Sequence, residues 1–113
     1  MRLGRVMRLG KVLGVFELDE NGNILYSSLE GGNGSASLET IIKGRNFFAE
    51  IADFTNVEQF RRLFNVFRLG DSPASGFDFT CDYPDGPTNV RVLLARSQKD
   101  STHDSFLVHL RKV

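Results

Sequence analysis

The feature that most constrains the fold is a change in the spacing of apolar residues near residue 70. In residues 56–69 they recur three and four positions apart, which places them on one face of a helix. These residues are Phe60, Leu63, Phe64 and Phe67. From Gly76 onward apolar and polar residues alternate, as they do in a strand with one buried face. An amphipathic helix next to alternating strands predicts an α+β fold, with helices packed on a sheet.

Both ends of the predicted helix carry cap signals. Asn56 is a typical N-cap residue, and Gln59 three positions later completes a capping-box pattern. Gly70 predicts a left-handed C-terminal cap, because glycine adopts positive φ without steric cost. We therefore expect one longer helix over about residues 56–69.

Five strands are predicted, all antiparallel. Residues 13–27 form a hairpin, because Asn21-Gly22 is the strongest short-range signal for a tight turn. Alternation predicts three more strands, over residues 77–82, 90–94 and 106–110, with turns at 84–88 and 97–104. The sheet is thus expected to be covered on one face by the longer helix and by short helices.

The middle of the chain is less regular. Residues 28–37, rich in glycine and serine, predict a loop, and residues 38–43 a short helical or turn-like segment. The stretch GRNFFAEIADFTN, residues 44–56, has too few polar residues for a surface loop and too irregular a pattern for one helix. We interpret it as a kinked segment that faces the core.

Composition excludes several classes of protein. The chain has 113 residues, one-domain size, and its net charge is zero, so no global field favours nucleic acid. A single cysteine excludes an internal disulfide framework and favours a reducing compartment, so we expect a cytoplasmic protein. No apolar run approaches the length that spans a bilayer, and no membrane insertion is expected.

Residues 1–12 read as a basic leader that precedes a domain over residues 13–113. Two near-identical hexads, MRLGRV and MRLGKV, carry Arg2, Arg5, Arg8 and Lys11 without an acidic residue. One interpretation is a docking arm, and the other, which we favour, is a flexible leader.

Candidate sites centre on the aromatic residues. Phe47, Phe48, Ile51, Phe54 and Phe79 could line a ligand cavity or fill an ordinary core, and the sequence does not separate the two. Cys81 shares the strand face of Phe77 and Phe79. It is either a pocket thiol or, as we favour, a small buried side chain. His103 and His109 lie apart without a carboxylate pattern, so no metal site is expected. The sequence shows no recognisable group of catalytic side chains. We therefore predict that the chain is not an enzyme.

Several motifs resemble those of the PAS family, within it the photoactive yellow protein branch. The motifs are LDENGNIL (18–25), GRNFF (44–48), FDFTCDY (77–83), PTNVRVLL (87–94) and RKV (111–113). The resemblance covers most of residues 13–113 and is weakest at the glycine loop. It implies a PAS fold with a pocket between the sheet and the short helices, and a role as a sensor in signal transduction.

The resemblance also implies what chemistry is missing. In this branch a cysteine carries a thioester-linked chromophore, and the gapless match places Phe54 at that position. The tyrosine and glutamate that hydrogen-bond the chromophore correspond to Tyr26 and Glu30 after a one-residue shift, or to Ser27 and Gly31 without it. Flavin-binding LOV domains need a cysteine where this chain has Phe47. Haem-binding relatives need a histidine in the helical segment, and residues 38–69 contain none.

The resulting expectation is a sensor or signal-transduction domain of bacterial two-component type, with no covalently bound cofactor. An unknown small apolar ligand could occupy the pocket. The candidate pocket residues are Phe47, Phe48, Ile51, Phe54, Phe79, Cys81, Tyr26 and Glu30. We expect a homodimer and, as effector, a histidine kinase or another domain. The alternative is a ligand-free dimerisation or protein-interaction module.

Overall fold

The computed structural model describes residues 12–30, 35–97 and 104–113. Within these residues the chain forms five strands, two α-helices and one π-helical turn. In chain order these are β1 (Gly14–Asp19), β2 (Ile24–Leu29), α1 (Ser35–Ile42), η1 (Phe47–Ile51), α2 (Val57–Leu69), β3 (Ala74–Tyr83), β4 (Gly86–Ser97) and β5 (Ser105–Lys112).

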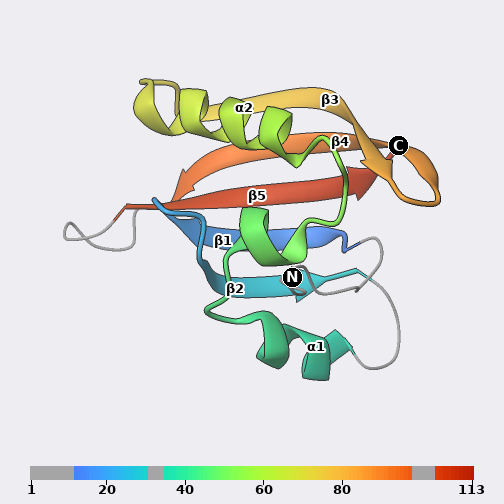
Figure 1. Cartoon of the computed structure of the whole chain (residues 1–113). Coiled ribbons are helices and arrows are strands. Elements are labelled where there is room, and N and C mark those ends of the chain that lie inside the picture. The colour runs from blue at the N-terminus through green and yellow to red at the C-terminus, as the bar shows by residue number, and fades with distance from the viewer. Residues whose placement is uncertain (1–11, 31–34, 98–103) are drawn as a thin grey trace.

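The strands form one antiparallel sheet in the order β2-β1-β5-β4-β3 (Figure 1). The first and last strands pair at its centre, where Gly14 lies opposite Leu110 and Asp19 opposite Ser105. Figure 1 shows η1 and α2 over one face of the sheet and α1 beyond the edge strand β2. The predicted α+β fold with a five-stranded antiparallel sheet is confirmed.

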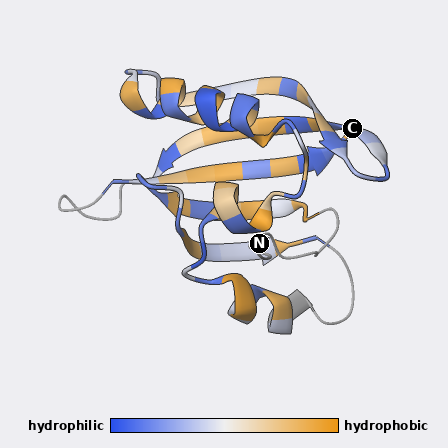
Figure 2. Cartoon of the chain, viewed as in Figure 1, coloured by the Kyte–Doolittle hydropathy of each residue, from blue (hydrophilic) through white to orange (hydrophobic). Residues whose placement is uncertain are grey.

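The helical layer and the sheet meet through phenylalanine side chains. Figure 2 shows hydrophobic and hydrophilic residues alternating along α2, whose buried residues are Phe60, Phe64 and Phe67. Phe64 packs edge-on against Phe106 of β5, with ring centroids 5.6 Å apart. The predicted apolar face is correct except at Leu63, which is 40% exposed because it lies at the margin of the stripe.

Asn56 and Gly70 are the N-cap and C-cap residues of α2, as predicted, but neither caps the helix in the predicted way. Asn56 makes no side-chain cap bond. Its amide instead donates to the Thr80 carbonyl and accepts from the Asp82 N–H, which ties the start of α2 to β3. Its contact with Gln59 is a side-chain pair, Nδ2 to Oε1 at 3.4 Å, rather than a capping box.

Gly70 has φ −92°, so the C-terminal cap is extended rather than left-handed. The last carbonyls of α2 are taken by the Arg96 guanidinium of β4, which donates to the carbonyls of Phe67 and Arg68. The same group lies over the Phe67 ring, 4.9 Å from its centroid. Because a cation donates hydrogen bonds to the last carbonyls of the helix, a left-handed glycine cap is not needed to satisfy them.

Two boundaries in the first half differ from those expected. Strand β2 continues to Leu29, and α1 begins at Ser35, so the ends of the predicted 28–37 loop belong to regular elements. Residues 31–34 of that loop lie outside the described residues, as do 98–103 of the 97–104 connection. Val12, placed with the leader by sequence, is buried against the core, and residues 1–11 are outside the described part.

The hairpin turn is where the sequence prediction was most specific. Gly22 has φ +90°, as a tight turn requires. A β-carbon at Gly22 would lie 2.7 Å from the Phe48 ring, so the turn needs glycine for space as well as for conformation. None of the helices in the described ranges is long and apolar enough to cross a membrane.

We expect Arg96→Ala to lower the free energy of unfolding by about 2 kcal/mol, because hydrogen bonds from a charged donor to the α2 carbonyls are lost. Arg91→Ala is the matched control on the same strand. Its exposed ion pair with Asp78 is worth about 0–1 kcal/mol. Urea denaturation of both variants measures the difference, and equal losses would show that Arg96 is only another surface arginine.

Candidate functional site

The site is built around η1, whose shape is fixed by side chains at its start. The Asn46 side-chain oxygen, Oδ1, accepts from the N–H groups of Phe48 and Ala49. The Glu50 carboxylate accepts from the Asn46 N–H and pairs with Arg45 at 2.9 Å. These two partners, the backbone N–H first, hold the pKa of Glu50 below its usual value. The wide turn directs Phe47, Phe48 and Ile51 inward.

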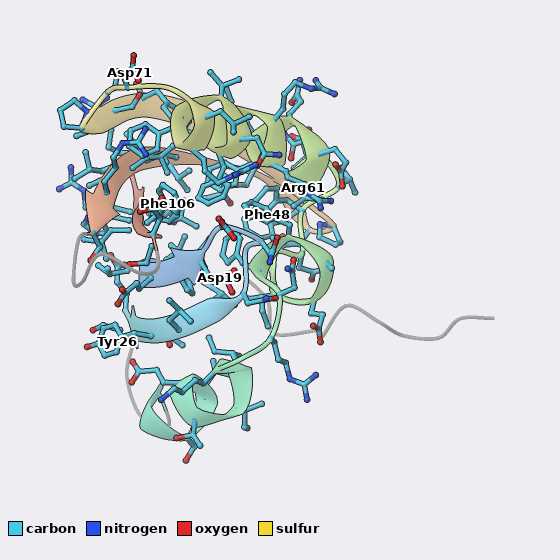
Figure 3. The ribbon with its side chains drawn as sticks, turned by 90° about the vertical axis from the view of Figure 1, so that its left-hand side faces the viewer. Asp19, Tyr26, Phe48, Arg61, Asp71 and Phe106 are labelled. Atoms are coloured by element: carbon cyan, nitrogen blue, oxygen red, sulfur yellow. The ribbon has the colours of Figure 1, made fainter. Side chains whose placement is uncertain are left out.

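Phe47 and Phe48 connect η1 to the sheet and to α2. The Phe47 ring lies 5.0 Å from that of Phe16 on β1. The Phe48 ring lies 5.2 Å from that of Phe64 on α2. Figure 3 shows Phe48 and Phe106 between α2 and the strands. Such tilted and edge-on pairs are the favoured geometries of aromatic rings and add to the burial of apolar area.

Phe54 is held in a closed aromatic environment. Only 3% of it is exposed, and its ring packs edge-on against Phe60 and Tyr83, with centroids 6.0 and 5.5 Å away. The next residue, Thr55, donates its N–H to the Asp82 carbonyl and so anchors this part of the chain to β3. The Phe54 side chain therefore fills the space between β3 and the start of α2.

Cys81 lies beside this ring cluster on β3 and is fully buried. Burial raises the pKa of the Cys81 thiol from 9.0 to about 11, against the lowering effect of its hydrogen bond with Tyr83. Burial, and then the neighbouring thiol, also raise the pKa of Tyr83. Since the thiolate is the nucleophile and metal ligand, a thiol protonated at neutral pH is poorly suited to either role.

Six of the eight candidate pocket residues come together and two do not. Phe47, Phe48, Ile51, Phe54 and Cys81 belong to one buried core, with the half-buried Phe79 packed against it. Tyr26 is 56% exposed at the outside of β2 (Figure 3), and Glu30 is also exposed. In this conformation Tyr26 and Glu30 lie outside the aromatic cluster.

The structure adds aromatic residues that sequence reasoning did not assign to the site. Phe16, Phe60 and Phe64 contact the η1 rings, and Tyr83 contacts both Phe54 and Cys81. Tyr83 had a usable signal, because it continues the alternation of Phe77, Phe79 and Cys81. The partners of Phe16 and Phe60 depend on tertiary packing and left no local signal.

Three surface hollows, of about 340, 330 and 380 Å³, are lined by none of these core aromatic residues. No group of three or more metal-ligating side chains occurs within residues 12–30, 35–97 and 104–113. His109 lies on the outer face of the sheet opposite Leu93, and His103 is outside the described residues. Six of the candidate residues therefore lie in or against the aromatic core rather than in these three hollows.

Known proteins resemble the chain over most of its length, although no protein-family model matches it. It is 34% identical over 101 residues to photoactive yellow protein from Rhodothalassium salexigens, covering 88% of this chain and 78% of that protein. It is 29% identical over 98 residues to photoactive yellow protein from Halochromatium salexigens, covering 86% and 78%.

Solved structures support the same fold. The photoactive yellow protein domain of the sensor histidine kinase Ppr from Rhodospirillum centenum has a TM-score of 0.65 at 24% identity, covering 88% of this chain and 85% of that one. A PAS domain from a two-component sensor histidine kinase has a TM-score of 0.55 at 13% identity, covering 89% and 85%.

The fold is that of a PAS domain, a class of sensor signalling domains. Within that class the chain belongs to the photoactive yellow protein branch, as its motifs implied. Its relatives are photoreceptor or sensor domains rather than known enzymes.

The described residues do not fit the branch's covalent chromophore. The only cysteine of the chain is Cys81, which is fully buried on β3 with a raised pKa. The position that the resemblance gives to the chromophore cysteine holds Phe54, which has no nucleophilic atom. Tyr26 and Ser27 are the alternative positions for the tyrosine that hydrogen-bonds the chromophore. The Tyr26 side chain points to solvent, and the Ser27 side chain points into the protein.

The stability difference between the wild type and Cys81→Ala should shift with pH. The unfolded thiol loses its proton near pH 9, whereas the folded one keeps it to about pH 11. Its contribution is thus fully present below pH 9 and is lost as the pH rises toward 11. Between pH 8 and pH 10 the wild type should lose about 1.4 kcal/mol relative to Cys81→Ala.

Urea midpoints of the two variants across this range measure the effect. Tyr83 is common to both, so its own titration largely cancels in the difference. A difference that stays constant from pH 8 to pH 10 would mean that the fold accommodates a thiolate at Cys81.

Proposed function

We propose that this chain is a signal-transduction PAS domain that works without a covalently attached chromophore and relays a change of state to a partner. The observation that carries this proposal is the burial of the Phe54 ring between β3 and α2. The resemblance gives this position to the branch's chromophore cysteine. The relatives from sensor histidine kinases support a kinase or another effector domain as the partner. We place the protein in the cytoplasm as a homodimer.

The contacts around Phe54 offer a route for such a relay. A movement of the ring would act on α2 and β3 together, because Thr55 and Asn56 bond directly to the β3 backbone at Asp82 and Thr80. β3 is an edge strand of the sheet, and no other strand of the described residues lies along its outer side. A shift of this edge is therefore accessible to a partner without unfolding the core.

Two modes of input are compatible with the fold. In the first, a small apolar ligand enters among Phe47, Phe48, Ile51, Phe54 and Phe79 and displaces a ring. In the second, the core stays closed and the domain acts as a ligand-free dimerisation or interaction module. The continuous ring packing favours the second mode, because a ligand must first break contacts that together stabilise the core by several kcal/mol.

A variant with an artificial cavity separates these modes. Phe54→Ala should lower the free energy of unfolding by about 3–5 kcal/mol and leave an apolar cavity that binds benzene. The wild type should not bind benzene measurably if its core is closed. Phe67→Ala is the control, because it opens space at the far end of α2, against Phe106 and Arg96.

Thermal shift and NMR with benzene as the probe give the readout. Wild-type binding as tight as that of Phe54→Ala would contradict the closed core and favour the ligand sensor. A small molecule retained by the purified protein in native mass spectrometry would lead to the same conclusion. The same spectrum reports the proposed homodimer, and a monomer at micromolar concentration would contradict it.

A further inference from the structure

Two arginines face each other across neighbouring strands of the sheet. Arg91 of β4 lies directly opposite Arg111 of β5, and both are exposed. Because Val90 and Val92 of β4 point into the core, alternation places Arg91 on the outer face, which η1 and α2 leave uncovered (Figure 1). Like charges directly opposite each other on paired strands are destabilising. An anion bound between the two side chains would turn this repulsion into attraction.

A hollow lies beside this arginine pair. Its volume is about 340 Å³, at the lower end of the range for small-molecule sites, about 300–1,000 Å³. The lining residues come from β3, β4 and β5 and are Gly76, Arg91, Val92, Leu93, His109 and Arg111. The hollow therefore combines two guanidinium groups and an imidazole with the side chain of Leu93, which is 46% exposed.

Gly76 leaves the β3 side of the hollow without a side chain. It lies opposite Leu93 within β3, and its φ is not positive. Among the described residues, a β-carbon there would meet the Val92 carbonyl at 3.7 Å and the Leu93 side chain at 3.9 Å, both ordinary contacts. Neither conformation nor packing therefore requires glycine. A glycine within a strand weakens it, and it often marks a place where a ligand approaches the backbone closely.

The cationic side chains of the hollow have donors left for a ligand. Arg91 donates from Nη1 to the Asp78 carboxylate at 3.0 Å, which leaves its other guanidinium N–H groups. That ion pair is exposed and therefore weak, and Asp78 does not line the hollow. The side chains of Arg111 and His109 make no hydrogen bond or ion pair within residues 12–30, 35–97 and 104–113.

This set of donors suits a phosphate group better than a carboxylate. A phosphate monoester offers about two negative charges and three acceptor oxygens, so that each of the three side chains can contact an oxygen. The planar guanidinium group matches phosphate oxygens in pairs. We propose that this hollow binds a small phosphate monoester with an apolar body. Its phosphate contacts Arg91, Arg111 and His109, and its apolar part lies against Leu93 and above Gly76.

Titration of the full chain with phenyl phosphate, followed by amide NMR, tests this proposal. Shifts should centre on Arg91, Leu93 and Arg111. Inorganic phosphate, which lacks the apolar body, and benzoate, which lacks the second charge, should each bind more weakly. Arg111→Gln should weaken phenyl phosphate binding by at least about tenfold, because a charged hydrogen-bond donor is lost. Arg62→Gln is the matched control, because Arg62 is an exposed arginine on α2, and it should leave binding unchanged.

A second variant separates a shaped site from a simple excess of positive charge. Gly76→Val keeps every charge and fills part of the hollow, so it should also weaken phenyl phosphate binding by at least about tenfold. Valine favours strands, so the melting temperature of Gly76→Val should equal or exceed that of the wild type. Arg111→Gln should melt no lower than the wild type, because it relieves the repulsion with Arg91.

Three results would overturn the proposal. Phenyl phosphate could leave these amides unshifted at millimolar concentration, Arg111→Gln or Gly76→Val could bind it like the wild type, or inorganic phosphate or benzoate could bind as tightly. The hollow lies on the outer face of the sheet, so its failure says nothing about Phe54, and the benzene experiment does not depend on it.

Discussion

The packing of the η1 phenylalanines against both halves of the sheet is the interaction on which the rest of the structure depends. Phe47 reaches β1 through Phe16, and Phe48 reaches β5 through Phe64 and Phe106. Gly22 must lack a side chain because the Phe48 ring occupies the adjacent space. A single five-residue turn thus fixes the hairpin, the helix and the centre of the sheet relative to one another.

That dependence bears directly on function. The segment that organises the core occupies the place where members of the photoactive yellow protein branch hold their chromophore, as the resemblance implies. Here Phe54 is buried among aromatic rings, and Cys81 is buried with a raised pKa. Opening the core for a ligand would therefore cost stability. A signalling domain with this core is better suited to relay through its surface and edges than through a bound pigment.

Features that local periodicity encodes were predicted correctly from the sequence. Features that depend on contacts with residues distant in sequence were missed. Alternation and helical spacing were enough for the sheet and α2. The predicted cap interactions of α2 do not form, because Asn56 bonds to β3 and Arg96 bonds to the last helical carbonyls. Both partners lie more than twenty residues away in sequence. Likewise, η1 depends on Asn46, whose amide also bonds the Asn21 carbonyl and Asn23 of the first hairpin. No local pattern contains these contacts. Tyr26 was a candidate by position, but it points away from the core.

We propose that this member of the branch does not attach a chromophore covalently. This proposal is tested most directly by incubating the native protein with an activated p-coumaroyl donor and then measuring its denatured intact mass and visible absorbance. We expect an unchanged mass and no visible band, and Cys81→Ala should give the same result. A mass increase of one p-coumaroyl group, absent from Cys81→Ala and accompanied by a band that survives denaturation, would contradict it.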